Sequence, residues 1–283
     1  MVYKMVLSDL DGTLLRGDKS ISDYTERTLR RLTDSGAWFV PATGRCLSVV
    51  PTEIRRLSFL RYAICGNGSV IHNLEHHRTL HRDCLTLEQV ESILDILYPM
   101  QCATDCHIND DQVIMSRHHL DTLETRIPSA GVRAYMRRTR IPADDFRGEI
   151  REARSIHKIH TMFYRESDLQ KAREWLRSAF PTLTITNSNS FNIELTSPTA
   201  NKGTAMQILA DYLGVSQEQT MAFGDASNDS FMLKAAGKGV AMENAEAGVL
   251  ACADDITLSN ENDGVAVAIE KYCFHKNQEG DKL

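Results

Sequence analysis

Short apolar segments alternate with amphipathic helical segments at both ends of this 283-residue chain. The predicted strands are residues 4–8, 37–42, 62–65, 220–223, 239–242 and 255–258, and the predicted helices are residues 23–35, 202–213, 227–236 and 245–252, with a last helix that ends near residue 272. Alternating strands and helices of this kind build a parallel sheet that helices cover on both faces. The sequence therefore predicts an α/β fold with a doubly wound, Rossmann-like parallel-sheet core.

The middle of the chain has a different pattern. Two helices and five strands are predicted there, at residues 86–97 and 167–179 and at residues 102–107, 112–117, 156–164, 183–186 and 191–195. Successive strands joined by short polar turns favour an antiparallel α+β module. We therefore expect a core domain formed by residues 1–83 and 196–283 and an inserted domain formed by residues 84–195.

Composition and charge limit the classes of partner. The net charge of −6 would not attract a nucleic acid or an anionic membrane, and no segment approaches the roughly 20 apolar residues that span a bilayer. Seven cysteines without a compact spacing and the absence of an export signal favour reduced thiols in the cytoplasm. We expect a cytoplasmic protein that binds neither nucleic acid nor membrane. Whether it is a monomer or a homodimer is left open.

Four short polar motifs accompany the predicted parallel strands. Residues 9–13 (DLDGT), 43–45 (TGR) and 224–229 (GDASND) each follow a strand, and Lys202-Gly203 opens a helix. Open α/β sheets bind ligands at the carboxyl ends of their strands. The motifs therefore predict one site at that edge of the sheet.

The side chains in these motifs suit one reaction. Asp9, Asp11 and Asp225 would bring several carboxyl oxygens together, which is tolerable with a cation between them, and an all-oxygen ligand set suits Mg²⁺. Asp9 could attack phosphorus, and Asp11 could protonate the leaving oxygen and then activate water. Thr43 offers a hydroxyl donor and Lys202 a fixed positive charge. These residues predict phosphoryl transfer.

The constellation resembles the haloacid dehalogenase-like hydrolases, whose four motifs match DLDGT, Thr43, Lys202 and GDASND in order. The neighbouring segments ATGR, Gly66-Asn67-Gly68, FNIEL and GVAMENA are similar to the Cof-type subfamily in particular. The resemblance implies a Mg²⁺-dependent phosphatase that acts on a small phosphorylated metabolite. It also implies that the inserted domain is a cap that sets specificity.

The resemblance assigns roles residue by residue. It implies that Asp9 is the nucleophile, and that Asp11 is the acid/base and binds the metal through its backbone carbonyl. It makes Asp225 the third protein ligand of Mg²⁺, supported by Asp229. The residues expected to contact substrate or phosphate are Thr43, Gly44, Arg45 and Asn228.

Spacing places the cap. Only 31 residues separate Asp11 from Thr43, whereas 158 separate Thr43 from Lys202. The resemblance to Cof-type proteins implies a cap at this later insertion point, which favours a phosphohydrolase over a phosphomutase. Two alternatives remain: a phosphotransferase or mutase that uses the same aspartyl-phosphate, and a weakly active metabolite-binding protein on the same fold. Small sugar phosphates are the first expected substrates, ahead of flavin or pyridoxal phosphates.

Two further features have plain structural interpretations. Gly66-Asn67-Gly68 is typical of a tight turn, with a substrate contact as the alternative that the resemblance suggests. A cluster of arginines in the cap is typical of a solvated face, with attraction of anionic substrates as the alternative. The arginines are Arg133, Arg137, Arg138 and Arg140.

Overall fold

The core sheet takes its five strands from both ends of the chain. In the computed structural model, which describes residues 3–127, 129–188 and 190–274, the strand order is β14-β13-β12-β1-β2 and every neighbouring pair is parallel. The strands are β1 (Met5–Ser8), β2 (Trp38–Pro41), β12 (Thr220–Gly224), β13 (Lys238–Met242) and β14 (Asp255–Thr257). The predicted α/β class with a doubly wound core is confirmed.

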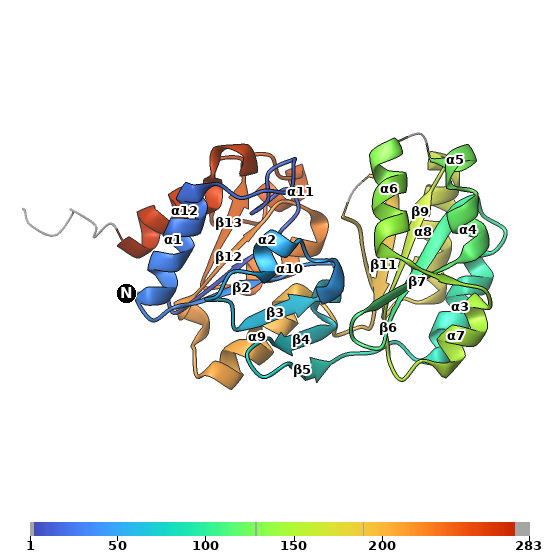
Figure 1. Ribbon diagram of the computed structural model, residues 1–283, viewed down its shortest axis with the longest axis horizontal. Coiled ribbons are helices and arrows are strands. Elements are labelled where there is room, and N and C mark those ends of the chain that lie inside the picture. The colour runs from blue at the N-terminus through green and yellow to red at the C-terminus, as the bar shows by residue number, and fades with distance from the viewer. Residues whose placement is uncertain (1–2, 128, 189, 275–283) are drawn as a thin grey trace, which may run out of the picture.

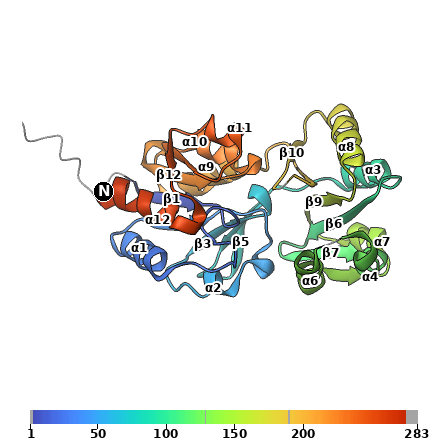
Figure 2. The same ribbon diagram turned by 90° about the horizontal axis from the view of Figure 1, so that it is seen from above.

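Helices cover both faces of this sheet because its strands are apolar on both sides. Met5 and Leu7 pack with α9, α10 and α11, whereas Val6 packs with α1, α2 and α12 on the other face. In Figure 2, α9, α10 and α11 lie on one side of β1 and α1 on the other. These helices are α1 (Asp23–Asp34), α2 (Thr52–Arg55), α9 (Lys202–Leu213), α10 (Ser230–Ala235), α11 (Ala247–Leu250) and α12 (Gly264–Ile269).

Shorter elements complete the core. An antiparallel sheet is formed by β3 (Tyr62–Cys65), β4 (Val70–Asn73) and β5 (Arg78–Arg82). The 3₁₀ turns are η1 (Leu47–Val49), η2 (Gly66–Gly68), η3 (Gln217–Gln219), η4 (Ser227–Asp229) and η5 (Asn260–Asn262), and a π-helical turn, η6 (Glu270–Phe274), follows α12. Among the described residues, none of the helices has the length and apolar character that crossing a membrane requires.

The cap is a six-stranded sheet with its own helices, drawn on the right of Figure 1. The strand order is β10-β11-β9-β6-β7-β8, antiparallel except for the last pair. The strands are β6 (Cys102–Ile108), β7 (Gln112–Ser116), β8 (Ile141–Ala143), β9 (Ile156–Phe163), β10 (Thr184–Thr186) and β11 (Asn192–Thr196). The helices are α3 (Leu87–Leu97), α4 (Arg117–Asp121), α5 (Leu123–Arg126), α6 (Ala130–Thr139), α7 (Phe146–Glu152) and α8 (Glu166–Ala179).

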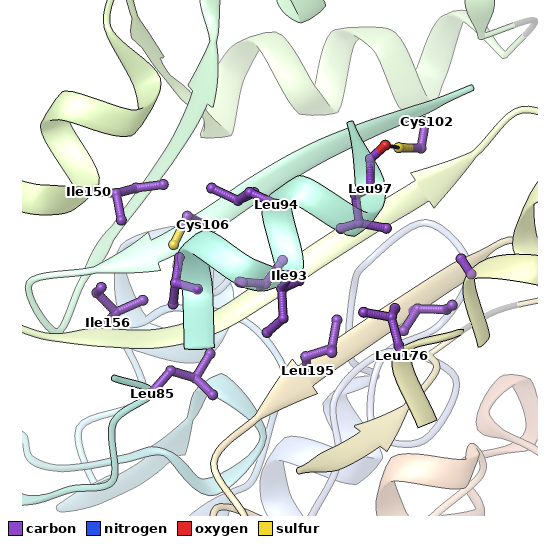
Figure 3. Close-up of a cluster of buried hydrophobic side chains, with 14 of the residues drawn as sticks. Leu85, Ile93, Leu94, Leu97, Cys102, Cys106, Ile150, Ile156, Leu176 and Leu195 are labelled. Carbon is purple, nitrogen blue, oxygen red and sulfur yellow. Dashed lines mark hydrogen bonds between the residues drawn. The ribbon is translucent and has the colours of Figure 1, made fainter. Parts of the chain in front are cut away.

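The two faces of the cap sheet differ in polarity. Helices α3, α7 and α8 bury apolar residues against one face, including Leu94, Ile150 and Leu176 (Figure 3). Side chains alternate along a strand, so the neighbours of buried Ile159 in β9 point the other way. These neighbours include Lys158, whose ammonium reaches the core. The cap therefore presents polar groups to the core.

Candidate active site

The structure brings the predicted motifs to one edge of the core sheet. Asp9 directly follows β1, Thr43 lies two residues after β2, and Asp225 directly follows β12. Because β1 lies between β12 and β2, all three residues meet at the carboxyl edge of the sheet. Lys202 reaches this edge from the first residue of α9.

Lys202 is the centre of the site. Its side chain is completely buried, and Nζ donates to Oδ1 of Asp9 at 2.5 Å and to Oδ1 of Asp229 at 2.6 Å. Burial opposes the charge, but the two carboxylates raise the pKa of Lys202 above its ordinary value. The helix is held close by Gly203, since a Cβ there would lie 2.5 Å from the carbonyl oxygen of Phe231. Lys202 is therefore a charged, fixed group.

Three carboxylates surround this lysine. Each of Asp9, Asp225 and Asp229 offers one oxygen, and these oxygens lie within 4.8 Å of one another. Asp229 uses Oδ2 to accept the N–H groups of Asp225 (2.9 Å) and Ala226 (3.0 Å), and Asp225 accepts from the Thr13 hydroxyl at 2.6 Å. The group thus holds more negative charge than Lys202 balances.

The pKa values report this imbalance. Burial raises the pKa of Asp9 well above its ordinary value, and the nearby carboxylates of Asp229 and Asp225 raise it further against the opposing effect of Lys202. Burial, followed by the charge of Asp229, raises the pKa of Asp225 to about 7. A cation would relieve the repulsion.

The residues fit a hard divalent cation. The donor atoms are carboxylate oxygens without sulfur or imidazole, which is the ligand set that Mg²⁺ prefers. Space for close approach comes from Gly12, whose φ is +84° and whose Cβ, if present, would lie 2.4 Å from Oδ2 of Asp225. A side chain at this position would collide with the candidate ligand.

The carboxylate of Asp11 was expected to lie with those of Asp9 and Asp225, but it is turned elsewhere. Its oxygens accept from Nε and Nη2 of Arg45 at 2.6 and 2.8 Å and from Nζ of Lys19 at 2.8 Å. Burial alone would raise the pKa of Asp11, but the hydrogen bonds and charge of Arg45, then those of Lys19, lower it to about 2. The carboxylate is therefore ionised and turned toward Arg45, and Asp229 takes its place among the clustered acids.

Arg45 also contacts the cap. Its Nη1 donates to the hydroxyl of Tyr135 in α6 at 3.0 Å, and the guanidinium lies 5.1 Å from the centre of the Tyr135 ring. Arg140 lies at the same distance from this ring and pairs with the fully buried Asp105 at 2.8 Å. The expectation of a solvated face is thus wrong for Arg140, because a buried carboxylate of β6 requires its charge.

The remaining predicted contacts lie close by: Thr43 and Asn228 are buried, and Gly44 is partly exposed. Thr43 accepts the N–H of Arg45 through its hydroxyl at 3.2 Å, and the Gly44 carbonyl accepts from Lys158 at 2.5 Å. Asn228 donates through Nδ2 to Asn67 at 3.1 Å, and its buried Oδ1 has no hydrogen-bond partner among the described residues.

Two further residues at this edge were missed from the sequence. Lys158 of β9 and Glu194 of β11 form an ion pair of 3.0 Å that is almost completely buried. The available signal was a charged residue next to large aliphatic residues in each strand: Lys158 precedes Ile159, and Glu194 lies between Ile193 and Leu195. It was not informative alone, because a charge in a strand usually faces solvent.

Known proteins with similar sequences belong to the family that the motifs resemble. The family model described as haloacid dehalogenase-like hydrolase matches residues 6–269. Phosphatase YwpJ of Bacillus subtilis is 32% identical over 285 residues, covering 93% of this chain and 97% of that protein. The 5-amino-6-(5-phospho-D-ribitylamino)uracil phosphatase YcsE of the same organism is 30% identical, covering 96% of each chain.

A solved structure agrees with both sequence relatives. A haloacid dehalogenase-like hydrolase from B. subtilis superposes with a TM-score of 0.83 at 30% identity, covering 95% of this chain and 99% of that one. The Cof-type resemblance noted from the motifs is confirmed. The chain belongs to the haloacid dehalogenase-like hydrolases, in the part of that family whose curated relatives are named phosphatases.

Proposed function

We propose that this protein is a Mg²⁺-dependent phosphatase that hydrolyses a small phosphorylated metabolite through an aspartyl-phosphate formed on Asp9. The observation that carries the proposal is the buried contact of Asp9 with Lys202, beside Asp225 and Asp229, at the carboxyl edge of the core sheet. A carboxylate held by a fixed cation beside a metal site is suited to attack phosphorus.

The proposed chemistry has two steps. An oxygen of Asp9 forms a bond to phosphorus while the bond to the leaving oxygen breaks, and Asp11 gives the leaving oxygen its proton. Water then attacks phosphorus and loses a proton to Asp11, and the bond between phosphorus and Asp9 breaks to release phosphate. Lys202 restrains Asp9 and offsets charge on the transferring group.

The proposed metal ligands are the carboxylates of Asp9 and Asp225 and the backbone carbonyl of Asp11. Asp229 would support them without touching the metal, because its oxygens are already engaged by Lys202 and by two backbone N–H groups. When bound, Mg²⁺ would offset negative charge on the phosphoryl oxygens. The proposed contacts to phosphate or substrate are Thr43, Gly44, Arg45 and Asn228.

The proposed domain limits stay at residues 1–83 and 196–283 for the core and 84–195 for the cap.

We infer that the leaving group lies against the polar face of the cap, near Tyr135 and Arg140. The hydroxyl groups of a sugar or polyol phosphate can pair with the hydrogen-bond donors and acceptors there. The similarity to a relative named for a phosphoribityl substrate supports this class.

Replacing Asp9 with Asn tests the nucleophile. The purified variant should turn over an aryl phosphate in Mg²⁺ at less than about a hundredth of the wild-type rate, because the amide cannot form the acyl phosphate. Asp34→Asn, an exposed change at the end of α1, is the control and should behave as wild type. Turnover by Asp9→Asn above that level would refute the assignment.

The alternatives are separated with the wild-type protein. Phosphate release that stops in EDTA supports the phosphatase. Transfer of phosphate to an added sugar acceptor in preference to water would identify a phosphotransferase. Tight binding of phosphorylated metabolites without turnover would identify a binding protein.

A further inference from the structure

A chain of buried polar contacts joins the cap to the proposed phosphate site. Lys158 and Glu194 are 2% and 3% exposed, so their ion pair is shielded from water. Lys158 also donates to the carbonyl oxygen of Gly44 at 2.5 Å. The second oxygen of Glu194 accepts from Nδ2 of Asn67 at 2.7 Å, and Asn67 accepts from Nδ2 of Asn228 at 3.1 Å. The contacts run without a break from two cap strands to three core segments: the loop at Gly44, the turn at Asn67 and the turn at Asn228.

Glu194 determines the direction of these hydrogen bonds. An ionised carboxylate can only accept, so the amide of Asn67 must turn its NH₂ group toward the cap and its oxygen toward Asn228. Burial would raise the pKa of Glu194, but the charge of Lys158 leads the effects that lower it to about 2. The orientation of Asn228 in the core therefore depends on a charge in the cap.

The backbone around these side chains leaves little room for other arrangements. Asn67 has φ +60° and ψ +29°, a left-handed conformation that asparagine tolerates better than most residues. A Cβ at Gly44 would lie 2.7 Å from Oδ1 of Asn67 and 3.4 Å from Nζ of Lys158. We call the chain of contacts through Lys158, Glu194, Asn67 and Asn228 the relay. The loop that carries Thr43 is thus packed directly against the relay.

We propose that the Lys158–Glu194 pair is a positioning device: through Gly44 and Asn67 it holds the Thr43-Gly44 loop and the Asn228 side chain in place, so that the phosphate site is complete only when the cap is seated. Neither residue of the pair touches the reacting atoms. The inference rests on the proposed phosphatase function.

Inorganic phosphate, used as a product inhibitor, is the probe. In Glu194→Gln, an NH₂ group must face either the Lys158 ammonium or the Asn67 amide, and the relay is broken or reversed. We expect the inhibition constant of phosphate to rise by roughly tenfold, with a similar fall in kcat/KM on an aryl phosphate, since the relay depends on a charge-assisted hydrogen bond.

A second variant keeps the ion pair intact. Asn67→Gly preserves the left-handed backbone without strain and removes only the amide. It should weaken phosphate inhibition by a similar factor, and the double variant should lose little more than either single one, because both changes cut the same relay.

Asp111→Asn is the matched control. It also removes a charge from a cap residue that contacts the core, since Oδ1 of Asp111 accepts the N–H of Ser48 at 2.5 Å, but it lies outside the relay. The inhibition constant of phosphate and the kcat/KM of this variant should equal those of the wild type. Wild-type constants in Glu194→Gln and Asn67→Gly, or fully additive losses in the double variant, would overturn the positioning role alone. An inactive wild-type enzyme would overturn the proposed function as well.

Discussion

Replacing Lys202 with Met should destabilise the protein more than removal of an ordinary surface charge. Methionine keeps much of the side-chain volume in α9 but removes the ammonium. Its loss leaves Oδ1 of Asp9 and Oδ1 of Asp229 without the buried donor that they share, since each lies within 2.6 Å of Nζ and the lysine has no exposed surface. The change therefore tests the charge balance directly.

The magnitude follows from two limits. Hydrogen bonds to charged groups are worth about 1.5–3 kcal/mol each, so two of them set an upper limit of about 6 kcal/mol. Removing one partner of a buried ion pair costs about 3–5 kcal/mol. In metal-free protein above neutral pH we expect a loss of about 3–5 kcal/mol in the free energy of unfolding.

Protonation limits this loss as the pH falls. Burial already raises the pKa of Asp9 in the folded wild type, and removing Lys202 removes the charge that opposes this rise, so Asp9 binds a proton more readily in the folded variant than in the folded wild type. The folded state then holds more protons, so the variant gains stability relative to wild type as the pH is lowered. The gain is at most about 1.4 kcal/mol per pH unit. Mg²⁺ should also reduce the difference, because it supplies positive charge to the same carboxylates.

The assay can be confined to the core. The chain has two tryptophans, Trp38 in β2 and Trp175 in α8 of the cap. In a Trp175→Phe background, urea unfolding followed by fluorescence reports the core alone. A loss below about 1 kcal/mol in EDTA at about pH 8 would refute the reasoning, since a surface pair of charges contributes no more than that. A loss that does not shrink at lower pH would also contradict it.

Two further predictions concern the metal site. Gly12→Ala should raise the Mg²⁺ concentration needed for half-maximal activity by at least about tenfold, because its Cβ would meet Oδ2 of Asp225 at 2.4 Å; unchanged Mg²⁺ titrations would contradict this. In EDTA, the melting temperature should fall as the pH rises from about 4 through 7, because the pKa of Asp225 is raised to about 7 and the folded state binds the extra proton. Asp225→Asn should flatten that pH dependence.

Much of the core could be predicted because its signals are local. The strand Tyr62–Cys65 and the helix Lys202–Leu213 are found at the predicted residues. The helix begins after Asn201, whose side chain caps it, and ends at Gly214 in a left-handed conformation, so both limits are encoded by neighbouring residues. The motifs could be placed on one edge of the sheet because each of the strands they follow was itself predicted from local sequence.

The short cap elements were not predicted. Helices α4, α5, α6 and α7 and strand β8 lie between residues 117 and 152, where no element was predicted beyond residue 117, the last residue of an expected strand. The helices α4 and α5 have only five and four residues and contain charged side chains. Helices this short depend on packing against the sheet, and packing leaves no clear periodic signal in so few residues.

Long-range pairing explains the other gaps. Glu194 meets Asn67, which lies 127 residues earlier, and Lys202 meets Asp9, which lies 193 residues earlier. The motifs predicted that Lys202 and Asp9 would share one site, although not their direct contact, and nothing local predicted that Glu194 would meet Asn67. The orientation of the Asp11 carboxylate was equally hidden, because it depends on the distant guanidinium of Arg45.

The proposed role of Asp11 requires its surroundings to change during the reaction. With a pKa of about 2, Asp11 holds no proton to give to a leaving oxygen at neutral pH. Its pKa is low chiefly because Arg45 donates two hydrogen bonds to it, against the opposing effect of burial. A phosphate dianion that draws Arg45 away would remove those bonds and add negative charge beside Asp11, and both effects raise its pKa. Transfer of Arg45 from Asp11 to the substrate would therefore bind the phosphate and prepare the acid in one movement.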